Sequence, residues 1–404
     1  MKQFQQSDML KSLPKQFFAN LVKKVEKVKL EHDDVINLGQ GNPDQPTPSH
    51  IVKALQEATE NSVYHKYAPF RGFSFLKEAV ATYYKREYDV DLDPETEVAV
   101  LFGTKTGLVE ISQCLLNKDD IALVPDPGYP DYWSGIAIAG GKMSPMPLLE
   151  ENQYLPDFSK ITDRTLEKSK LMFLNYPNNP TGAIATQELF EQAIKVGEEN
   201  DICIVHDFAY GAIGFDQERP ISFMQIPDAK NAGIEMMTLS KTYNMAGWRI
   251  GFAVGNASVI DALNLFQDHY YCSVFGGIQE AAATALLESQ ACVTKLVDCY
   301  QNRRDVFIKA ISEIGWKVDA PKGSFFAWLP VPPSYTSEQF ADLLLQKARV
   351  VVASGNGFGK FGEGYVRIGL LSSEDKLVEA AQRIGRLNIV WNEQDAIDSN
   401  HSRT

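Results

Sequence analysis

The apolar positions between about residues 97 and 241 alternate between two patterns. Short apolar runs are followed by stretches in which apolar residues recur at helical spacing. This alternation predicts βαβ units and an α/β fold with a largely parallel sheet that is buried on both faces. The runs lie within residues 97–103, 120–130, 170–182, 201–210 and 236–241.

The rest of the chain follows a different pattern, in which longer helical stretches dominate. Residues 315–331 indicate a strand, a turn at Gly323 and a second strand. Arg303 and Arg304 fall on the polar face of a predicted long helix. Such a section predicts a smaller α+β domain. The helices that we expect outside the βαβ section lie at 14–29, 49–59, 276–314, 337–347 and 373–386.

The chain length of 404 residues favours more than one domain. We expect the N-terminal segment to join the smaller domain, so that the larger domain is continuous in sequence. The last residues are polar and predict a frayed tail. The predicted boundaries are an N-terminal arm with part of the small domain at 1–46, a large domain at 47–289, a small C-terminal α+β domain at 290–391 and a polar tail at 392–404.

Composition and charge exclude several classes of protein. Hydrophobic residues make up 44% of the chain and charged residues 23%, which is typical of a globular protein. The formal charge of −13 argues against a nucleic-acid or anionic-membrane surface. No apolar run approaches the roughly 20 residues that span a bilayer, and the N-terminus has no signal-peptide pattern. Five scattered cysteines without CxxC spacing fit reduced thiols in the cytoplasm.

Polar groups directly follow each of the five apolar runs. In a parallel sheet, ligands bind at the carboxyl ends of the strands, where these groups would meet. They comprise small backbone donors, an aromatic ring, an amide, a carboxylate with a phenol, and an amine. Five such different strand ends together predict a functional site. The segments are 103–107, 126–129, 175–182, 206–210 and 238–241.

The lysine among these groups suggests covalent chemistry. Lys241 ends one apolar run, and Arg249 follows eight residues later before the next run. The amine can form an imine with an aldehyde cofactor, and the guanidinium can hold a phosphate. A lone lysine at a strand end would more often be an ordinary surface residue, so the assignment depends on the other strand ends.

An aldehyde-bearing pyridine phosphate would use the remaining groups. Asp207 could keep the ring nitrogen protonated, although an acid here could also cap a helix. Tyr210 and Asn179 could donate to the phenolic oxygen, although Asn179 could merely shape its turn. Tyr129 could stack on the ring or belong to the core. A phosphate would take backbone N–H groups and hydroxyls, which are available at Thr104, Lys105, Thr238 and Ser240.

Nearly the whole chain resembles the class I/II aminotransferases, the pyridoxal-phosphate (PLP) enzymes of fold type I. The resemblance extends from NLGQGNPDQPTP to YVRIGL, and its markers are NYPNNPTG, the Asp207–Tyr210 pair, SKTYNMAGWRIG and Arg367. It implies a mostly parallel seven-stranded sheet flanked by helices, plus a smaller α+β domain. It also implies ping-pong transfer of an amino group between an L-amino acid and a 2-oxo acid.

The resemblance also implies a role for each matched residue. Lys241 matches the Schiff-base lysine and proton shuttle, and Asp207 matches the partner of the pyridine nitrogen. Tyr67 matches a tyrosine that reaches the neighbouring subunit's phosphate site, which implies a homodimer. The other matches are Asn179 and Tyr210 at the phenolic oxygen; Thr104, Lys105, Thr238, Ser240 and Arg249 at the phosphate; Tyr129 on the ring; and Arg367, Gly41 and Asn179 at the substrate carboxylate.

The substrate side chain is predicted to be neutral. We find no second arginine of the dicarboxylate-specific kind, and the segment DHYYCSVFGG near its usual place is aromatic and apolar. Runs such as YNMAGWRIGFAVGNASVIDA and KGSFFAWLPVP resemble the methionine-salvage branch, which aminates 2-oxo-4-methylthiobutyrate to methionine. Kynurenine-type and LL-diaminopimelate-type transamination, PLP-dependent C–S lyase or β-elimination chemistry, and a silent PLP-binding regulator domain are the alternatives.

Two further motifs have simpler explanations. Residues 357–362 match GxGxxG, but a second strand is expected after them, whereas a dinucleotide site needs a helix. His206 precedes Asp207, yet the six histidines form no metal-ligand spacing. We therefore expect His206 to be buried or packed near the cofactor.

Overall fold

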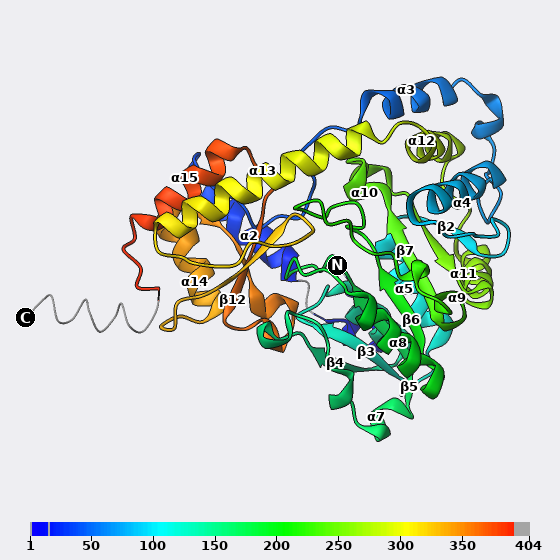
Figure 1. Ribbon diagram of the computed structural model, residues 1–404, viewed down its shortest axis with the longest axis horizontal. Coiled ribbons are helices and arrows are strands. Elements are labelled where there is room, and N and C mark those ends of the chain that lie inside the picture. The colour runs from blue at the N-terminus through cyan, green and yellow to red at the C-terminus, as the bar shows by residue number, and fades with distance from the viewer. Residues whose placement is uncertain (1, 15–16, 392–404) are drawn as a thin grey trace, which may run out of the picture.

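The computed structural model describes residues 2–14 and 17–391 (Figure 1). The predicted tail at 392–404 lies outside the described residues. Figure 1 shows two bodies, a larger one around a central sheet and a smaller one that contains both the C-terminal elements and the N-terminal helix α2. None of the described helices is long and apolar enough to cross a membrane.

The larger body is built on a seven-stranded sheet in the order β2-β8-β7-β6-β5-β3-β4. Strand β8 runs antiparallel to both of its neighbours, and the other pairs are parallel. The prediction of a mostly parallel sheet is thereby confirmed. The strands are β2 (Val98–Leu101), β3 (Ile121–Asp126), β4 (Lys142–Pro147), β5 (Ser169–Asn175), β6 (Cys203–Asp207), β7 (Gly233–Thr238) and β8 (Gly251–Gly255).

Both faces of this sheet are covered, which explains why its strands are continuous apolar runs. In β5, Leu171 and Phe173 face one core cluster, while Met172 and Leu174 face another. Because successive side chains of a strand point to opposite faces, each face needs its own layer of helices. One layer contains α5 (Thr104–Leu115), α6 (Asp131–Ala139) and α11 (Ala257–Tyr270); the other contains α4 (Ser74–Tyr88), α8 (Gln187–Asn200) and α12 (Gly276–Leu287).

The smaller body surrounds a three-stranded antiparallel sheet in the order β11-β12-β9. The N-terminal segment joins it, since β1 (Ile36–Asn37) pairs with β10 (Val350–Val351). The domain boundaries at residues 46 and 289 stay a prediction. The other elements here are α2 (Phe17–Lys29), α13 (Ala291–Glu313), β9 (Phe326–Pro330), α14 (Ser337–Leu343) with a π-turn at Leu344–Ala348, β11 (Ala353–Ser354), β12 (Tyr365–Gly369) and α15 (Glu374–Gly385).

The prediction of one long helix over 276–314 is wrong. The structure has two helices, α12 and α13, separated by residues 288–290. The side chain of Gln290 donates to the carbonyl oxygens of Ala285 (3.1 Å) and Glu288 (2.8 Å) and thereby satisfies groups at the end of α12. Helical periodicity continues across the break, so the apolar pattern does not reveal it.

Arg303 and Arg304 do not lie on a polar face, as the pattern predicts, but are 5% and 3% exposed. Arg303 forms a two-pronged ion pair with Asp44, and Arg304 forms another with Asp216.

The first of the two strands expected within 315–331 is also absent from the part of the chain that the structure describes. Among the described residues of that segment, β9 is the one strand that forms. The short helices are α1 (Asp8–Ser12), α3 (Ser49–Ala58), α7 (Asp163–Leu166), α9 (Ala229–Ala232) and α10 (Leu239–Thr242).

Candidate active site

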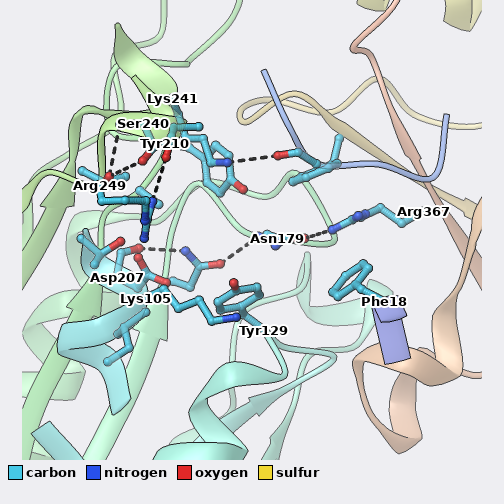
Figure 2. A pocket seen from close by; sticks show the side chains of 18 residues that line it. Phe18, Lys105, Tyr129, Asn179, Asp207, Tyr210, Ser240, Lys241, Arg249 and Arg367 are labelled. Atoms are coloured by element: carbon cyan, nitrogen blue, oxygen red, sulfur yellow. Dashed lines mark hydrogen bonds between the residues drawn. The ribbon is translucent and has the colours of Figure 1, made fainter. Parts of the chain in front are cut away.

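A cavity of about 410 Å³ lies where the carboxyl ends of the parallel strands face the smaller body. All the predicted site residues except Tyr67 line it, and Figure 2 shows most of them pointing into the same space. The structure therefore brings together strand ends that are far apart in sequence. Phe18, Leu108, Asn175, Ala209, Ala246 and Phe326 complete the lining.

Lys241 enters the cavity from α10, directly after β7. Its Nζ donates to the carbonyl oxygen of Gly41 at 3.0 Å. Loss of water around the amine and the positive charges of Arg367 and Arg249 lower the pKa of Lys241 to about 8. More of this amine is therefore neutral at a given pH than of a lysine in water.

Asp207 is the last residue of β6, and its carboxylate is only half satisfied. The hydroxyl of Tyr132 donates to Oδ2 at 2.8 Å, while the buried Oδ1 has no partner among the described residues. Burial raises the pKa of Asp207 to about 6, against the opposing effect of the Tyr132 hydrogen bond. A buried carboxylate oxygen without a donor is costly, so Oδ1 is suited to a ligand N–H.

The NYPNNPTG turn connects the backbone of Asp207 to Arg367. Asn175 Nδ2 donates to the backbone oxygen of Asp207 (2.8 Å), and its Oδ1 accepts the Asn179 N–H (2.8 Å). Arg367 Nη1 donates to Asn179 Oδ1 at 2.8 Å, and Nη2 donates to the carbonyl oxygen of Gly39 at 3.1 Å. This chain of bonds orients the Asn179 amide at the centre of the cavity, as Figure 2 shows.

The predicted phosphate cup lies at the start of α5. Gly103 precedes this helix with φ +73°, and a Cβ there would come 2.5 Å from Arg249 Nη2. Glycine thus allows the guanidinium to approach the backbone that leads into α5, where its Nη2 donates to the carbonyl oxygen of Phe102 at 3.3 Å. The hydroxyls of Thr238 and Ser240 lie 2.9 Å apart at the same end. Together these groups suit an anion.

Two tyrosines are predicted to contact the cofactor, and the structure places Tyr129 partly buried and Tyr210 buried. Tyr129 packs edge-to-face on Tyr132, with the ring centroids 5.8 Å apart. Tyr210 packs edge-to-face on Phe325 at 5.2 Å, and burial raises its pKa well above the ordinary value. Loss of water also raises the pKa of Tyr129 well above its ordinary value, so both phenols are neutral hydrogen-bonding groups at ordinary pH.

Unlike most of the other predicted residues, Lys105 and Tyr67 do not contribute a polar side-chain group to the cavity of their own chain. The Lys105 amine forms an ion pair with Asp131 at 3.1 Å, so that its contribution to the cup is confined to the backbone N–H. Tyr67 is 91% exposed and does not line the cavity of its own chain. Its predicted contact with a neighbouring subunit is not tested by a single chain.

Sequence reasoning gave no role to Tyr132, Asn175, Phe18 or Phe326, although Asn175 lies in the predicted segment 175–182. Tyr132 lies in the first turn of α6, three residues after Tyr129, and its bond to Asp207 depends on how that helix packs on the sheet. Asn175 is the first letter of the NYPNNPTG motif. Phe18 and Phe326 have no local signal, since each looks like an ordinary core residue of its own element.

The structure agrees with the simpler explanations of the GxGxxG match and of His206. The GxGxxG segment is followed by the strand β12, as expected, and not by a helix. His206 is fully buried and bonds Glu235 at 2.8 Å and the carbonyl oxygen of Tyr176 at 3.1 Å.

The cavity fits the predicted cofactor. The unpartnered Asp207 Oδ1 suits a protonated ring nitrogen, and the Gly103 cradle beneath Arg249 suits a phosphate. Lys241 supplies an amine of lowered pKa between them. These are the groups that PLP chemistry requires of a protein.

Comparisons with known proteins agree with the assignment of a PLP site to this cavity. Residues 33–384 match the family model described as aminotransferase class I and II. The chain is 64% identical to the L-glutamine–4-(methylsulfanyl)-2-oxobutanoate aminotransferase of Bacillus subtilis strain 168, covering 96% of this chain and 97% of that protein. It is 51% identical to the transaminase BacF of the same strain, covering 95% and 96%.

A solved structure of substrate-bound BacF superposes with a TM-score of 0.92 at 50% identity, covering 96% of this chain and 99% of that one. An aminotransferase from Staphylococcus aureus gives a TM-score of 0.90 at 40% identity, covering 95% and 100%. The chain therefore belongs to the class I and II aminotransferases, the PLP-dependent enzymes of fold type I that move an amino group between an amino acid and a 2-oxo acid.

Proposed function

We propose that this enzyme aminates 4-(methylsulfanyl)-2-oxobutanoate to methionine, as in methionine salvage. The observation that carries the proposal is the 64% identity, over 96% of the chain, to a Bacillus subtilis enzyme whose name specifies this oxo acid and L-glutamine. An LL-diaminopimelate aminotransferase, which represents one of the alternative activities, is only 42% identical to this chain. Glutamine is accordingly the donor to test first.

The cavity supports a substrate with one carboxylate and an uncharged side chain. Arg249 and Arg367 are the arginines among its lining residues, and Arg249 belongs to the phosphate cup. One guanidinium remains for the substrate, and it bonds Asn179 at 2.8 Å. We assign the α-carboxylate to Arg367 and Asn179, with the backbone of Gly41 on the other side. Phe18 and Leu108 give the cavity apolar surface for a thioether.

Lys241 is the residue that we propose to hold the cofactor and to move the proton at the substrate α-carbon. When bound, PLP supplies an aldehyde that couples to amines and a cationic ring that accepts electron density. A general base works best when its pKa lies near the working pH, and the lowered pKa of about 8 brings Lys241 closer to that range. The carbonyl oxygen of Gly41 accepts a hydrogen bond from this Nζ at 3.0 Å.

We propose that the other polar residues of the cavity orient the cofactor and stabilise its charged groups. Asp207 would bind the ring N–H through Oδ1, while Tyr132 fixes the carboxylate through Oδ2. Tyr210 and Asn179 would donate to the phenolic oxygen, and Tyr129 would cover the ring. The first turn of α5, Thr238, Ser240 and Arg249 would bind the phosphate, with Lys105 acting through its backbone.

We also propose a homodimer in which Tyr67 reaches the partner's phosphate cup. Exposed large apolar side chains gather in two segments, around residues 63–70 and 265–275, which is unusual for the free surface of a monomer. They are Val63, Tyr67, Phe70, Leu265, Tyr270 and Phe275.

We place the enzyme in the cytoplasm, because its five cysteines are all free thiols.

Mixing two inactive variants tests the shared site. Lys241→Ala lacks the amine, and Tyr67→Ala lacks the tyrosine, so neither homodimer should be active at limiting PLP. A hybrid dimer would contain one site with the intact Lys241 of one chain and the intact Tyr67 of the other, and activity should reappear on mixing. No recovery in hybrids verified by differential tagging would contradict the proposed position of Tyr67.

A screen of oxo acids with L-glutamine as donor tests the substrate. We expect the highest kcat/KM for 4-(methylsulfanyl)-2-oxobutanoate and strict dependence on an acceptor, with ping-pong kinetics. A higher kcat/KM for the LL-diaminopimelate or kynurenine reaction would refute the substrate assignment. Release of ammonia and a thiol from an S-alkylcysteine without any acceptor would favour the lyase alternative.

A further inference from the structure

The glycine-rich segment 355–362, GNGFGKFG, has no part in the chemistry described above. It forms two 3₁₀ turns (Gly355–Phe358 and Lys360–Gly362) that connect β11 to β12. Ala353 of β11 pairs with Arg367 of β12. The segment is therefore the connection of the hairpin that carries Arg367 in the smaller body.

This segment is fastened to Asp126, the last residue of β3 in the larger body. Asp126 Oδ2 accepts the N–H of Lys360 at 3.1 Å, and Oδ1 accepts the N–H of Phe361 at 2.9 Å. Two residues further on, the N–H of Gly128 donates to the carbonyl oxygen of Phe358 at 2.8 Å. Asp126 is only 8% exposed, so these charge-assisted bonds are shielded from water.

Gly359 is adapted to this contact. Its φ is +133°, and a Cβ at this position would come 2.1 Å from Asp126 Oδ1. A side chain would therefore push the carboxylate away from the two N–H groups that it accepts. The glycine in this GxGxxG match admits an aspartate of the same chain, not a nucleotide.

Phe358, which the contact holds in place, packs on Arg367. The Arg367 Cζ lies 4.7 Å from the centroid of the Phe358 ring, 4.0 Å from that of Phe326 and 5.3 Å from that of Phe18. The guanidinium makes hydrogen bonds only through Nη1 and Nη2, and the buried Nε has no partner among the described residues. Its position therefore depends on the three aromatic faces as well as on its two hydrogen bonds.

We infer that Asp126 is a positioning residue for the substrate carboxylate, which it influences through residues 355–362 and the Phe358 ring that packs on Arg367. The inference rests on the proposed role of Arg367. The same turn after β3 continues to Tyr129 on the cavity wall. Asp126 thus ties the wall of the larger body to the arginine of the smaller one.

Asp126→Asn is the first test, because the amide can accept one N–H but turns its NH₂ toward the other. The probe is 4-(methylthio)butanoate, which has the carboxylate and thioether but no carbonyl, titrated into the holoenzyme by calorimetry. We expect about tenfold weaker binding, in line with the effect of residues that act through a neighbour. KM for the oxo acid should rise by a similar factor with a smaller change in kcat, and the PLP dissociation constant should stay within about twofold.

Gly359→Ala is the second variant and has a matched control. It should reproduce the loss of carboxylate binding, because its methyl group displaces the Asp126 carboxylate. Gly364→Ala also places alanine at a positive φ (+89°) after the same loop, but its Cβ meets nothing within 4 Å. Gly364→Ala should bind the probe like the parent enzyme. Should Asp126→Asn fail to fold, the difference between the two alanine variants still decides.

Two results would overturn the inference. One is parental affinity for the probe in either Asp126→Asn or Gly359→Ala. The other is an equal loss of probe and PLP affinity, which would make Asp126 a purely structural contact. Arg367→Gln separates this inference from the proposed function: if this variant binds the probe like the parent, the role of Arg367 itself is wrong. If Arg367→Gln loses the probe and Asp126→Asn does not, only the positioning role fails.

Discussion

The two walls of the cavity are built in different ways. The wall of the larger body consists mainly of residues at or shortly after the carboxyl ends of its parallel strands, and the strand before each residue places it. The wall of the smaller body is assembled from Phe18, Phe326 and Arg367, which come from a helix and two strands far apart in sequence. We assign the cofactor to the first wall and the substrate carboxylate to the second.

The electrostatics of the two walls also differ. The cofactor wall pairs an acid whose pKa is raised to about 6 with an amine whose pKa is lowered to about 8. On the substrate wall, burial among aromatic rings lowers the pKa of Arg367 to about 10, which leaves it a cation at neutral pH. The first wall is thus suited to proton transfer, and the second to holding a fixed charge.

Replacing Lys241 should have the largest effect, and Lys105 offers a comparison within the same cavity. Lys241→Ala removes the amine of lowered pKa and should reduce kcat by about a thousandfold or more, because both covalent and general-base catalysis are lost. Lys105→Ala should have a far smaller effect, since its amine binds Asp131 and not the cavity centre. Both variants can be compared by their single-turnover rates and by the absorbance band of the bound cofactor.

A comparable loss in the two lysine variants would contradict the assignment of Lys241. So would a Lys241→Ala protein that keeps the absorbance of the covalently bound cofactor and loses it on addition of a donor amino acid.

The same contrast between the walls explains what the sequence could predict. Asp207, Asn179 and Lys241 stand directly after apolar runs, so their positions follow from the rule that strand ends of a parallel sheet meet. Phe18 could not be found in this way, because its contact with the Arg367 guanidinium exists only after α2 has packed on the smaller body. Arg367 itself came from a family resemblance and not from its local pattern.

The sequence pattern also failed to predict that polar residues of α13 are buried. Helical spacing places Arg303 outside the apolar stripe, but its partner Asp44 lies far away in sequence. A pattern of polar positions cannot distinguish a solvated charge from one that is paired in the interior. The break after α12 was missed for a similar reason, since it depends on where the side chain of Gln290 bonds.

The arginines of the two walls provide the second prediction. Arg249→Gln should raise the PLP dissociation constant about 10- to 100-fold, the effect of losing a charge-assisted hydrogen bond, and at saturating PLP its KM should change little. Arg367→Gln should raise KM for the oxo acid by a similar factor and leave PLP binding nearly unchanged. Fluorescence titration of PLP and steady-state kinetics give the two constants. An equal effect of both substitutions on PLP binding would contradict the division into a cofactor wall and a substrate wall.

The smallest expected effect tests how finely the cofactor wall is tuned. Tyr132→Phe removes the hydrogen bond to Asp207 Oδ2 and should lower kcat roughly fivefold, for a loss of about 1 kcal/mol. Burial raises the pKa of Asp207 and the Tyr132 hydroxyl opposes it, so the substitution should raise this pKa further. Asp207 must be ionised to bind the ring N–H, and the acid limb of the pH–rate profile should therefore move to higher pH.

Tyr176→Phe is the matched control for that shift, because its buried hydroxyl donates to the backbone oxygen of Tyr154 and not to a carboxylate. It removes one hydroxyl at a comparable depth, and its acid limb should coincide with that of the parent enzyme. An acid limb that stays in place in Tyr132→Phe, or moves equally in both variants, would show that Tyr132 does not tune Asp207. Burial would then be the main influence on the pKa of Asp207, which it raises, as it is on the pKa of Arg367, which it lowers.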